Sequence, residues 1–134
     1  MKKTLFYGGS SLLAQMWYKQ ITDKSKVILT QHKQKIQKSN SKVIQINETS
    51  LESIIKLIEE NQIEVIVNCV GLTNVEKCEL DRKNSFFLNA TVPLIIAKAC
   101  KKTKTKLVHI STDHLFDGKK SFYSETDKTF PLNQ

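Results

Sequence analysis

Short apolar runs recur along the chain up to Ser111, and more polar stretches separate them. The runs are rich in β-branched residues and are apolar at successive positions, which indicates strands that are buried on both faces. The expected strands are Lys3–Tyr7, Lys26–Thr30, Lys42–Ile46, Ile63–Cys69 and Lys106–Ser111. Strands of this kind belong to parallel sheets, and parallel strands need crossover connections between them.

Three of the connecting stretches have the spacing of a helix. The first follows Ser10 and Ser11, and either serine is a suitable N-cap. Its apolar residues are Leu12, Leu13, Met16 and Trp17. The second stretch is Leu51–Asn61. The third covers roughly Arg82–Lys102 and contains Pro93, which removes a helical hydrogen bond and therefore predicts a kink or bulge.

The alternation of strands and helices predicts an α/β fold, specifically a doubly wound parallel sheet of the Rossmann type with about five strands. We expect one domain over residues 1–134. The last segment, Thr112–Gln134, has no regular period, and such a long irregular stretch is unusual in a compact domain. The sheet is therefore expected to be incomplete at its C-terminal side.

Composition narrows the range of functions. No apolar run has the length of a membrane span, so we expect a cytoplasmic protein without membrane contact. The net charge of +8 raises nucleic acid as a partner, yet every basic residue except Arg82 is a lysine. Specific base reading depends on arginine, so no specific nucleic acid is expected. The cysteines and histidines lack the spacing of a metal site, and none is expected.

The turn after the first strand has part of a phosphate-binding pattern. Gly8, Ser11 and Ala14 occupy the three small-residue positions of a G-x-x-G-x-x-G motif. The candidate cofactor-binding residues in this turn are Gly8, Ser10, Ser11, Leu12 and Leu13. Only the first motif position is glycine, so a cofactor site and a simple tight turn are both open at this point.

The end of the second strand bears on the choice of cofactor. Dinucleotide folds that prefer NAD place an acidic residue here to hold the ribose hydroxyls. This chain has Gln31, His32 and Lys33 instead. Cationic groups suit a 2′-phosphate, so NADP(H) is favoured and NAD(H) is possible. An exposed basic loop without a ligand is the alternative.

Four segments resemble one known family. They are IVNCVGLTNVEKCE at 66–79, FLNATVPL at 87–94, LVHISTDHLFDG at 107–118 and YSETDKTFPLN at 123–133. Together they are similar to the dTDP-4-dehydrorhamnose reductases, which belong to the extended short-chain dehydrogenase/reductases. The resemblance implies an NADPH-dependent oxidoreductase that reduces a nucleotide-linked ketosugar in dTDP-rhamnose biosynthesis.

The resemblance also implies roles for individual residues. Thr112 matches the hydroxyl that hydrogen-bonds the reacting carbonyl, although its spacing alone is better explained by a turn cap. The segment after the fourth strand, with Asn68, Val70 and Gly71, would run along the nicotinamide, and Asn89 would hold a helical bulge facing the site. Thr73 and Asp113 are the candidate substrate-binding residues.

The family's proton donor is a tyrosine followed four residues later by a lysine, and the 134 residues contain no such pair. We therefore expect the cofactor-binding part of a reductase, truncated before the Tyr-x-x-x-Lys helix and the substrate domain and inactive alone. Apolar side chains of Val65, Val67, Val108 or Ile110 would then lie exposed and favour self-association or a partner chain. The alternative is a non-catalytic binding or regulatory relative, such as the methionine adenosyltransferase regulatory subunit.

Overall fold

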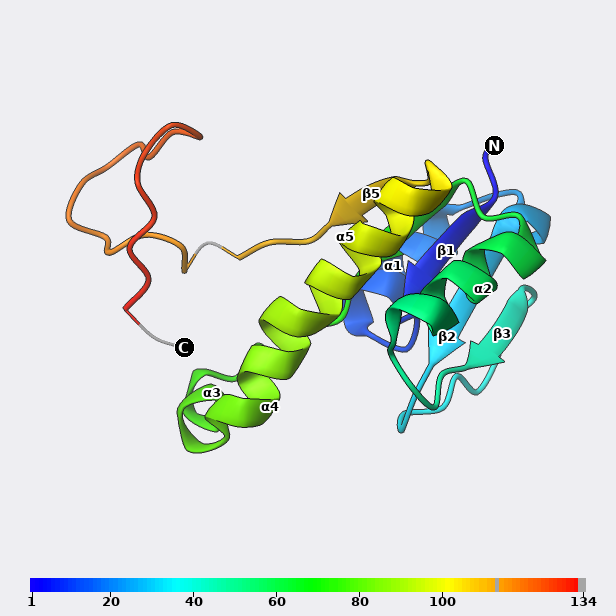
Figure 1. Cartoon of the computed structure of the whole chain (residues 1–134), viewed down its shortest axis with the longest axis horizontal. Helices are drawn as coiled ribbons and strands as arrows, with labels where there is room; N and C mark the ends of the chain where they lie inside the picture. The colour runs from blue at the N-terminus through cyan, green and yellow to red at the C-terminus, as the bar shows by residue number, and fades with distance from the viewer. Residues whose placement is uncertain (113, 133–134) are drawn as a thin grey trace.

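A computed structural model describes residues 1–112 and 114–132, and its centre is a five-stranded parallel sheet with the order β3-β2-β1-β4-β5 (Figure 1). The strands are β1 Thr4–Tyr7, β2 Val27–Gln31, β3 Lys42–Gln45, β4 Val65–Asn68 and β5 Lys106–His109. All five predicted strands are confirmed, with ends shifted by one or two residues. Every pairing is parallel, so the predicted α/β class is also confirmed.

The predicted helices are present as well. They are α1 Leu12–Gln20, α2 Leu51–Asn61 and a long helical run made of α4 Arg82–Phe86, the π turn η2 Phe87–Thr91 and α5 Val92–Thr103. The bulge expected near Pro93 is this π turn, which ends just before the proline. The short helix α3 Val75–Leu80 was not predicted, and a single 3₁₀ turn, η1 Lys24–Lys26, precedes β2.

Two hydrophobic clusters hold the layers together. The larger joins one face of the sheet to α2 and α5, which pack side by side in front of the sheet in Figure 1. Leu5 and Ile66 from the central strands meet Ile54 of α2 and Ile96 of α5 there, and each of them is at most 1% exposed. Burying a side chain of this size contributes roughly 1.5–3 kcal/mol. The smaller cluster joins the opposite face to α1.

Helix α1 buries an unexpected set of residues. Ala14 and Tyr18 face the sheet, whereas Leu12 is 80% exposed. Three further apolar residues of its sequence pattern are also exposed, namely Leu13, Met16 and Trp17. Trp17 keeps one ring contact, edge to face with Phe6 at a centroid distance of 5.5 Å. The helical spacing thus predicted the helix correctly, but the larger apolar side chains do not enter the core.

The same side of the sheet is uncovered beside α1. The register aligns Phe6 of β1 with Val67 of β4 and Val108 of β5, so these side chains share one face. Val67 is buried, contrary to the sequence-based expectation, because it packs with Phe6 in the cluster beneath α1. Val65 is half-buried, whereas Val108 and Ile110 are 40% and 37% exposed. An apolar strip therefore extends from α1 across β5.

Beyond β5 the chain leaves the sheet and forms a hook, coloured orange to red in Figure 1. Its own side chains hold it together. The rings of Phe116 and Tyr123 stack with centroids 4.2 Å apart, and the Tyr123 hydroxyl donates to Asp117 at 2.7 Å. Lys120 pairs with Asp127, whose carboxylate also accepts from the Ser124 N–H. These bonds lower the pKa of Asp117 and Asp127 to about 2.

The hook should therefore come apart in acid. A carboxyl pKa depressed from 3.8 to about 2 gives stability that is present above the unfolded value and lost as pH falls through the folded one. The Asp117 carboxylate also accepts from the Lys119 N–H at 3.2 Å. We expect the Lys119 and Ser124 amide resonances to be unchanged down to pH about 4 and to move as pH approaches about 2. Asp127→Asn should move the Ser124 resonance at neutral pH, because its charged acceptor is lost. Resonances of the parent chain that move near pH 4 would contradict the assignment.

The uncovered strip should make the chain self-associate, since large exposed apolar patches recruit partners. Sedimentation is expected to show a mass that rises with concentration above the 15.3 kDa of one chain. Combining Met16→Gln with Val108→Thr should restore the monomer. Leu80→Gln is the matched control, because Leu80 is 87% exposed but lies on α3. A monomeric parent chain at all concentrations would contradict this expectation.

Candidate functional site

Two cavities adjoin at the carboxyl ends of the strands. The first has a volume of about 620 Å³ and lies at the ends of β1, β2 and β3. The second, of about 600 Å³, lies at the ends of β4 and β5. Val70 and Gly71 line both of them. The order of the strands reverses between β1 and β4, and open α/β sheets bind ligands at that point.

The turn after β1 can only be built from glycine. Gly8 has φ +83°, and a Cβ there would lie 2.7 Å from Val70 Cγ2. At Gly9 a Cβ would lie 2.8 Å from the Cβ of Leu29 in β2. The Thr30 hydroxyl accepts from the Gly8 N–H at 2.9 Å and donates to the Phe6 carbonyl at 3.3 Å. The turn is therefore fixed from both neighbouring strands.

Ser11 caps α1, which decides between the two candidate serines. Its Oγ accepts from the Ala14 N–H at 3.3 Å, and its own N–H donates to the Gly8 carbonyl at 3.0 Å. Leu12 and Leu13 begin the helix, and backbone N–H groups in a first turn have no intrahelical acceptor. Such groups attract anions together with the helix dipole. Neither leucine lines the first cavity, whereas Ser10 and Ser11, just before the helix, both do.

Cys69, at the end of β4, lies against this turn and lines the first cavity. Burial raises the pKa of the Cys69 thiol, and a hydrogen bond with the Ser11 side chain partly opposes that rise. The thiol is thus protonated near neutral pH. It acts as a wall of the cavity and not as a nucleophile.

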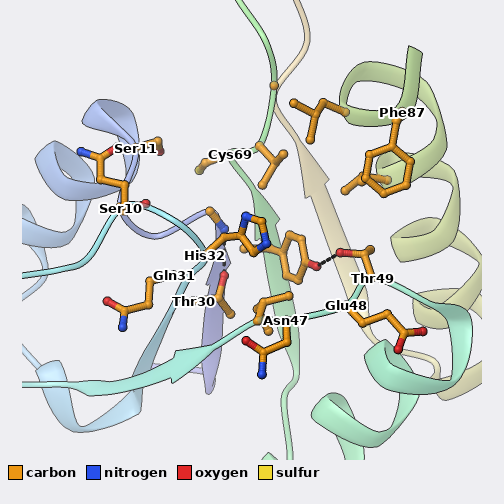
Figure 2. Close-up of a pocket in the computed structure, with 18 residues that line it drawn as sticks. Ser10, Ser11, Thr30, Gln31, His32, Asn47, Glu48, Thr49, Cys69 and Phe87 are labelled. Carbon is orange, nitrogen blue, oxygen red and sulfur yellow. Dashed lines mark hydrogen bonds between the residues drawn. The ribbon is translucent and has the colours of Figure 1, made fainter. Parts of the chain in front are cut away.

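The far wall of the first cavity comes from the ends of β2 and β3. Figure 2 labels Gln31 and His32 from the end of β2 and Asn47 and Thr49 from the segment after β3. Lys33, which was predicted with His32, does not line it. The Tyr7 and Thr49 hydroxyls are hydrogen-bonded at 2.6 Å. Burial raises the pKa of Tyr7 by more than this hydrogen bond lowers it, so the pKa lies above its ordinary value.

Sequence reasoning missed part of this wall. Asn47 and Thr49 follow the third strand, and the carboxyl ends of parallel strands share one edge of the sheet. That rule could have identified them from the predicted end of the strand. No comparable signal exists for Phe87, which reaches the cavity from the π turn.

The second cavity contains most of the residues predicted near the reacting group. Gly71, Thr73, Asn89 and Thr112 all line it. Asp113, the other predicted substrate-binding residue, lies outside the described residues. The Thr112 hydroxyl oxygen accepts from the His114 N–H at 3.2 Å, so the residue caps a turn and also lines the cavity. The two interpretations of Thr112 are thus compatible.

Asn89 holds the loop after β4 in place. From the π turn, its Oδ1 accepts from the Leu72 N–H at 2.7 Å and its Nδ2 donates to the Leu72 carbonyl at 3.1 Å. The bulge therefore presents an amide to the backbone that separates the two cavities. Asn68, by contrast, lines neither cavity and is 1% exposed. Its contact with any ligand would have to be indirect.

Other kinds of site are not evident in the residues described. Among residues 1–112 and 114–132 no three His, Cys, Asp or Glu side chains gather as metal ligands would. Within the same residues no helix is long and apolar enough to cross a membrane. The features present are a glycine turn without room for a Cβ, an open helix N-terminus and two adjoining cavities at a switch point.

These features define an α/β domain of the Rossmann class. The whole chain, residues 1–134, matches the RmlD substrate binding domain family, and the chain belongs to that family. A probable low-salt glycan biosynthesis reductase of Haloferax volcanii is 31% identical over 91 residues, which are 67% of this chain and 30% of that protein. The dTDP-4-dehydrorhamnose reductase of Salmonella typhimurium is 44% identical over 71 residues, 52% of this chain and 24% of that enzyme.

Solved structures agree with this assignment. A hypothetical dTDP-4-dehydrorhamnose reductase of Sulfolobus tokodaii superposes with a TM-score of 0.85 at 30% identity, over 98% of this chain and 46% of that one. An L-threonine dehydrogenase of Clostridium difficile superposes with a TM-score of 0.86 at 13% identity, over 99% of this chain and 44% of that one, and supports the fold alone. The chain thus spans less than half the length of these relatives.

Replacing Gly8 should test the turn directly. Gly8→Ala combines a positive φ with a clash against Val70, so the free energy of unfolding should fall by about 3 kcal/mol in urea titrations. Gly118→Ala is the matched control, because Gly118 has φ +72° but nothing within 4 Å of the added Cβ. It should cost about 1 kcal/mol or less. Equal effects of the two substitutions would show that the close approach to Val70 is unimportant.

Proposed function

We propose that this chain is the cofactor-binding part of an NADPH-dependent nucleotide-sugar reductase similar to dTDP-4-dehydrorhamnose reductase. The observation that carries the proposal is the junction of the two cavities at Val70 and Gly71. An elongated dinucleotide with its pyrophosphate at the Gly8 turn has room on one side toward His32. On the other side it has room toward Thr112.

The residues of the first cavity fit the adenosine half of such a cofactor. The first turn of α1 offers N–H groups to the pyrophosphate, and no side chain intervenes at Gly8, whose own N–H donates to Thr30. Gln31 and His32 would face the adenosine ribose, since they line the cavity at the end of β2. Ile46 and Phe87 provide apolar surface for the base. A nicotinamide bound in the adjoining cavity would supply the hydride.

The proposed role of Thr112 follows from its place in the second cavity. A carbonyl oxygen gathers negative charge as hydride arrives, and a hydroxyl donor there stabilises that charge. The proton itself needs a separate acid, and no Tyr-x-x-x-Lys pair occurs in the 134 residues. We therefore assign the acid to another part of the enzyme and expect no turnover from these residues alone.

Three further observations bear on the proposal. The relatives described above are named reductases, which favours a reductase over a non-catalytic regulatory protein. A dTDP-4-dehydrorhamnose reductase of Bacillus anthracis, 21% identical and with a TM-score of 0.77, is described in complex with NADP. Cys69, Cys78 and Cys100 are free thiols, which suits the reducing cytoplasm that we propose as the location.

Titration with the two dinucleotides tests the proposal. NADP should bind more tightly than NAD, because a 2′-phosphate at the end of β2 would meet His32 in the cavity and the adjacent Lys33 beside it, and no carboxylate follows that strand. Changing both residues to glutamine should weaken NADP by roughly fivefold to tenfold, as expected for the loss of one or two charge-assisted bonds, and leave NAD unchanged. Lys56→Gln is the control, since Lys56 lies on α2 and pairs with Glu60. Equal or tighter binding of NAD would refute the preference, and no binding of either would refute the function.

A further inference from the structure

A buried amide next to the second cavity controls the histidine beside it. Asn68 and His109 are register partners in β4 and β5, and Asn68 is 1% exposed. Asn68 Oδ1 accepts from the Val70 N–H at 3.1 Å, and Asn68 Nδ2 lies 3.1 Å from His109 Nδ1. Rotating the amide by half a turn would bring Nδ2 against the Val70 N–H, donor against donor. The orientation of the amide is therefore fixed.

This orientation determines the proton on His109. An amide nitrogen only donates, so His109 Nδ1 must accept. The ring is then neutral and carries its proton on Nε2. A proton on Nδ1 would place the Nδ1–H of His109 against the Nδ2–H of Asn68, donor against donor. The buried amide would then lack an acceptor. Asn68 thus selects one tautomer, although it contacts neither cavity itself.

The opposite nitrogen of the ring faces away from Asn68, and His109 lines the second cavity together with Thr112. His109 is exposed, unlike Asn68, and is therefore open to a ligand in that cavity. The side chains of His109 on β5 and of Thr112 just after β5 therefore line the same cavity. One is a hydroxyl, and the other is a neutral N–H donor of fixed tautomer.

We propose that His109 is a ligand-binding residue that donates its Nε2–H to an uncharged oxygen acceptor of the ligand in the second cavity. The inference rests on the proposed function, which supplies two sources of such an oxygen. One is the carboxamide of the nicotinamide, and the other is a carbonyl or hydroxyl of the sugar. Because the donor is neutral, it positions an oxygen without adding a cation beside the reacting carbonyl.

The tautomer can be observed without any ligand. Imidazole ¹⁵N spectra of the chain at about pH 8, above the ordinary histidine range, should show His109 with Nδ1 unprotonated and Nε2 protonated. His109→Phe identifies the signal by removing it. Asn68→Asp keeps an acceptor for the Val70 N–H but turns the other contact into an acceptor, so the tautomer should reverse. A wild-type ring protonated on Nδ1 would overturn the inference, whether or not Asn68→Asp folds.

Binding measurements test the contact itself with three probes. They are NADPH, a dTDP-linked 4-ketosugar and adenosine 2′,5′-bisphosphate, which lacks the nicotinamide half. His109→Phe should weaken either NADPH or the sugar nucleotide by roughly fivefold, the effect of one hydrogen bond, and His109→Gln should restore part of it. The bisphosphate is the control and should bind unchanged. Weaker NADPH binding identifies the carboxamide as the acceptor, and weaker sugar-nucleotide binding identifies the sugar.

Failure of this contact and failure of the proposed function give different results. If the parent chain binds NADPH and the bisphosphate but His109→Phe alters no affinity, the contact is wrong and the function stands. If the parent chain binds none of the three probes, the proposed function is wrong and the contact falls with it. Equal weakening of all three probes would indicate a general structural effect and would also overturn the contact.

Discussion

The close approach of three strand ends at Gly8 and Gly9 is the constraint on which the site depends. There is no room for a Cβ at either position, because Val70 stands against one glycine and Leu29 against the other. The left-handed backbone of Gly8 turns the chain out of β1, and the Thr30 hydroxyl satisfies the N–H that this turn exposes. As a result α1 starts at the edge of the sheet with its N-terminus directed at the first cavity.

Polar side chains then hold the loop after β4, which forms the wall shared by both cavities. Asn68 supports this loop from the sheet through the Val70 N–H, and Asn89 supports it from the π turn through Leu72. Within the described residues no buried side-chain nitrogen or oxygen lacks a hydrogen-bond partner. Since an unsatisfied buried polar group costs about 1–3 kcal/mol, these amides both position the loop and stabilise the fold.

The sequence predicted elements better than it predicted contacts. Runs such as Val65–Val67 identify strands because a parallel strand is apolar on both faces, and Pro93 with Asn89 located the π turn. Helix α3 was not predicted, because a segment of six residues is too short to show a clear helical period of apolar positions. The contact between Asn68 and His109 was not predicted either, because it depends on the register between β4 and β5. His32 and Lys33 are adjacent in sequence, but only the folded loop shows that His32 alone lines the cavity.

The glycine turn also explains why the two faces of the sheet are covered so differently. With Gly9 against Leu29, α1 begins very close to β2, and only a small residue fits between them at Ala14, which is 0% exposed. Of the larger side chains of α1 only Tyr18, near the far end of the helix, is buried, whereas Leu13, Met16 and Trp17 are exposed. A helix set farther from the sheet could bury them, but its N-terminus would then withdraw from the first cavity. The exposed apolar side chains of α1 thus accompany the same close packing that forms the glycine turn.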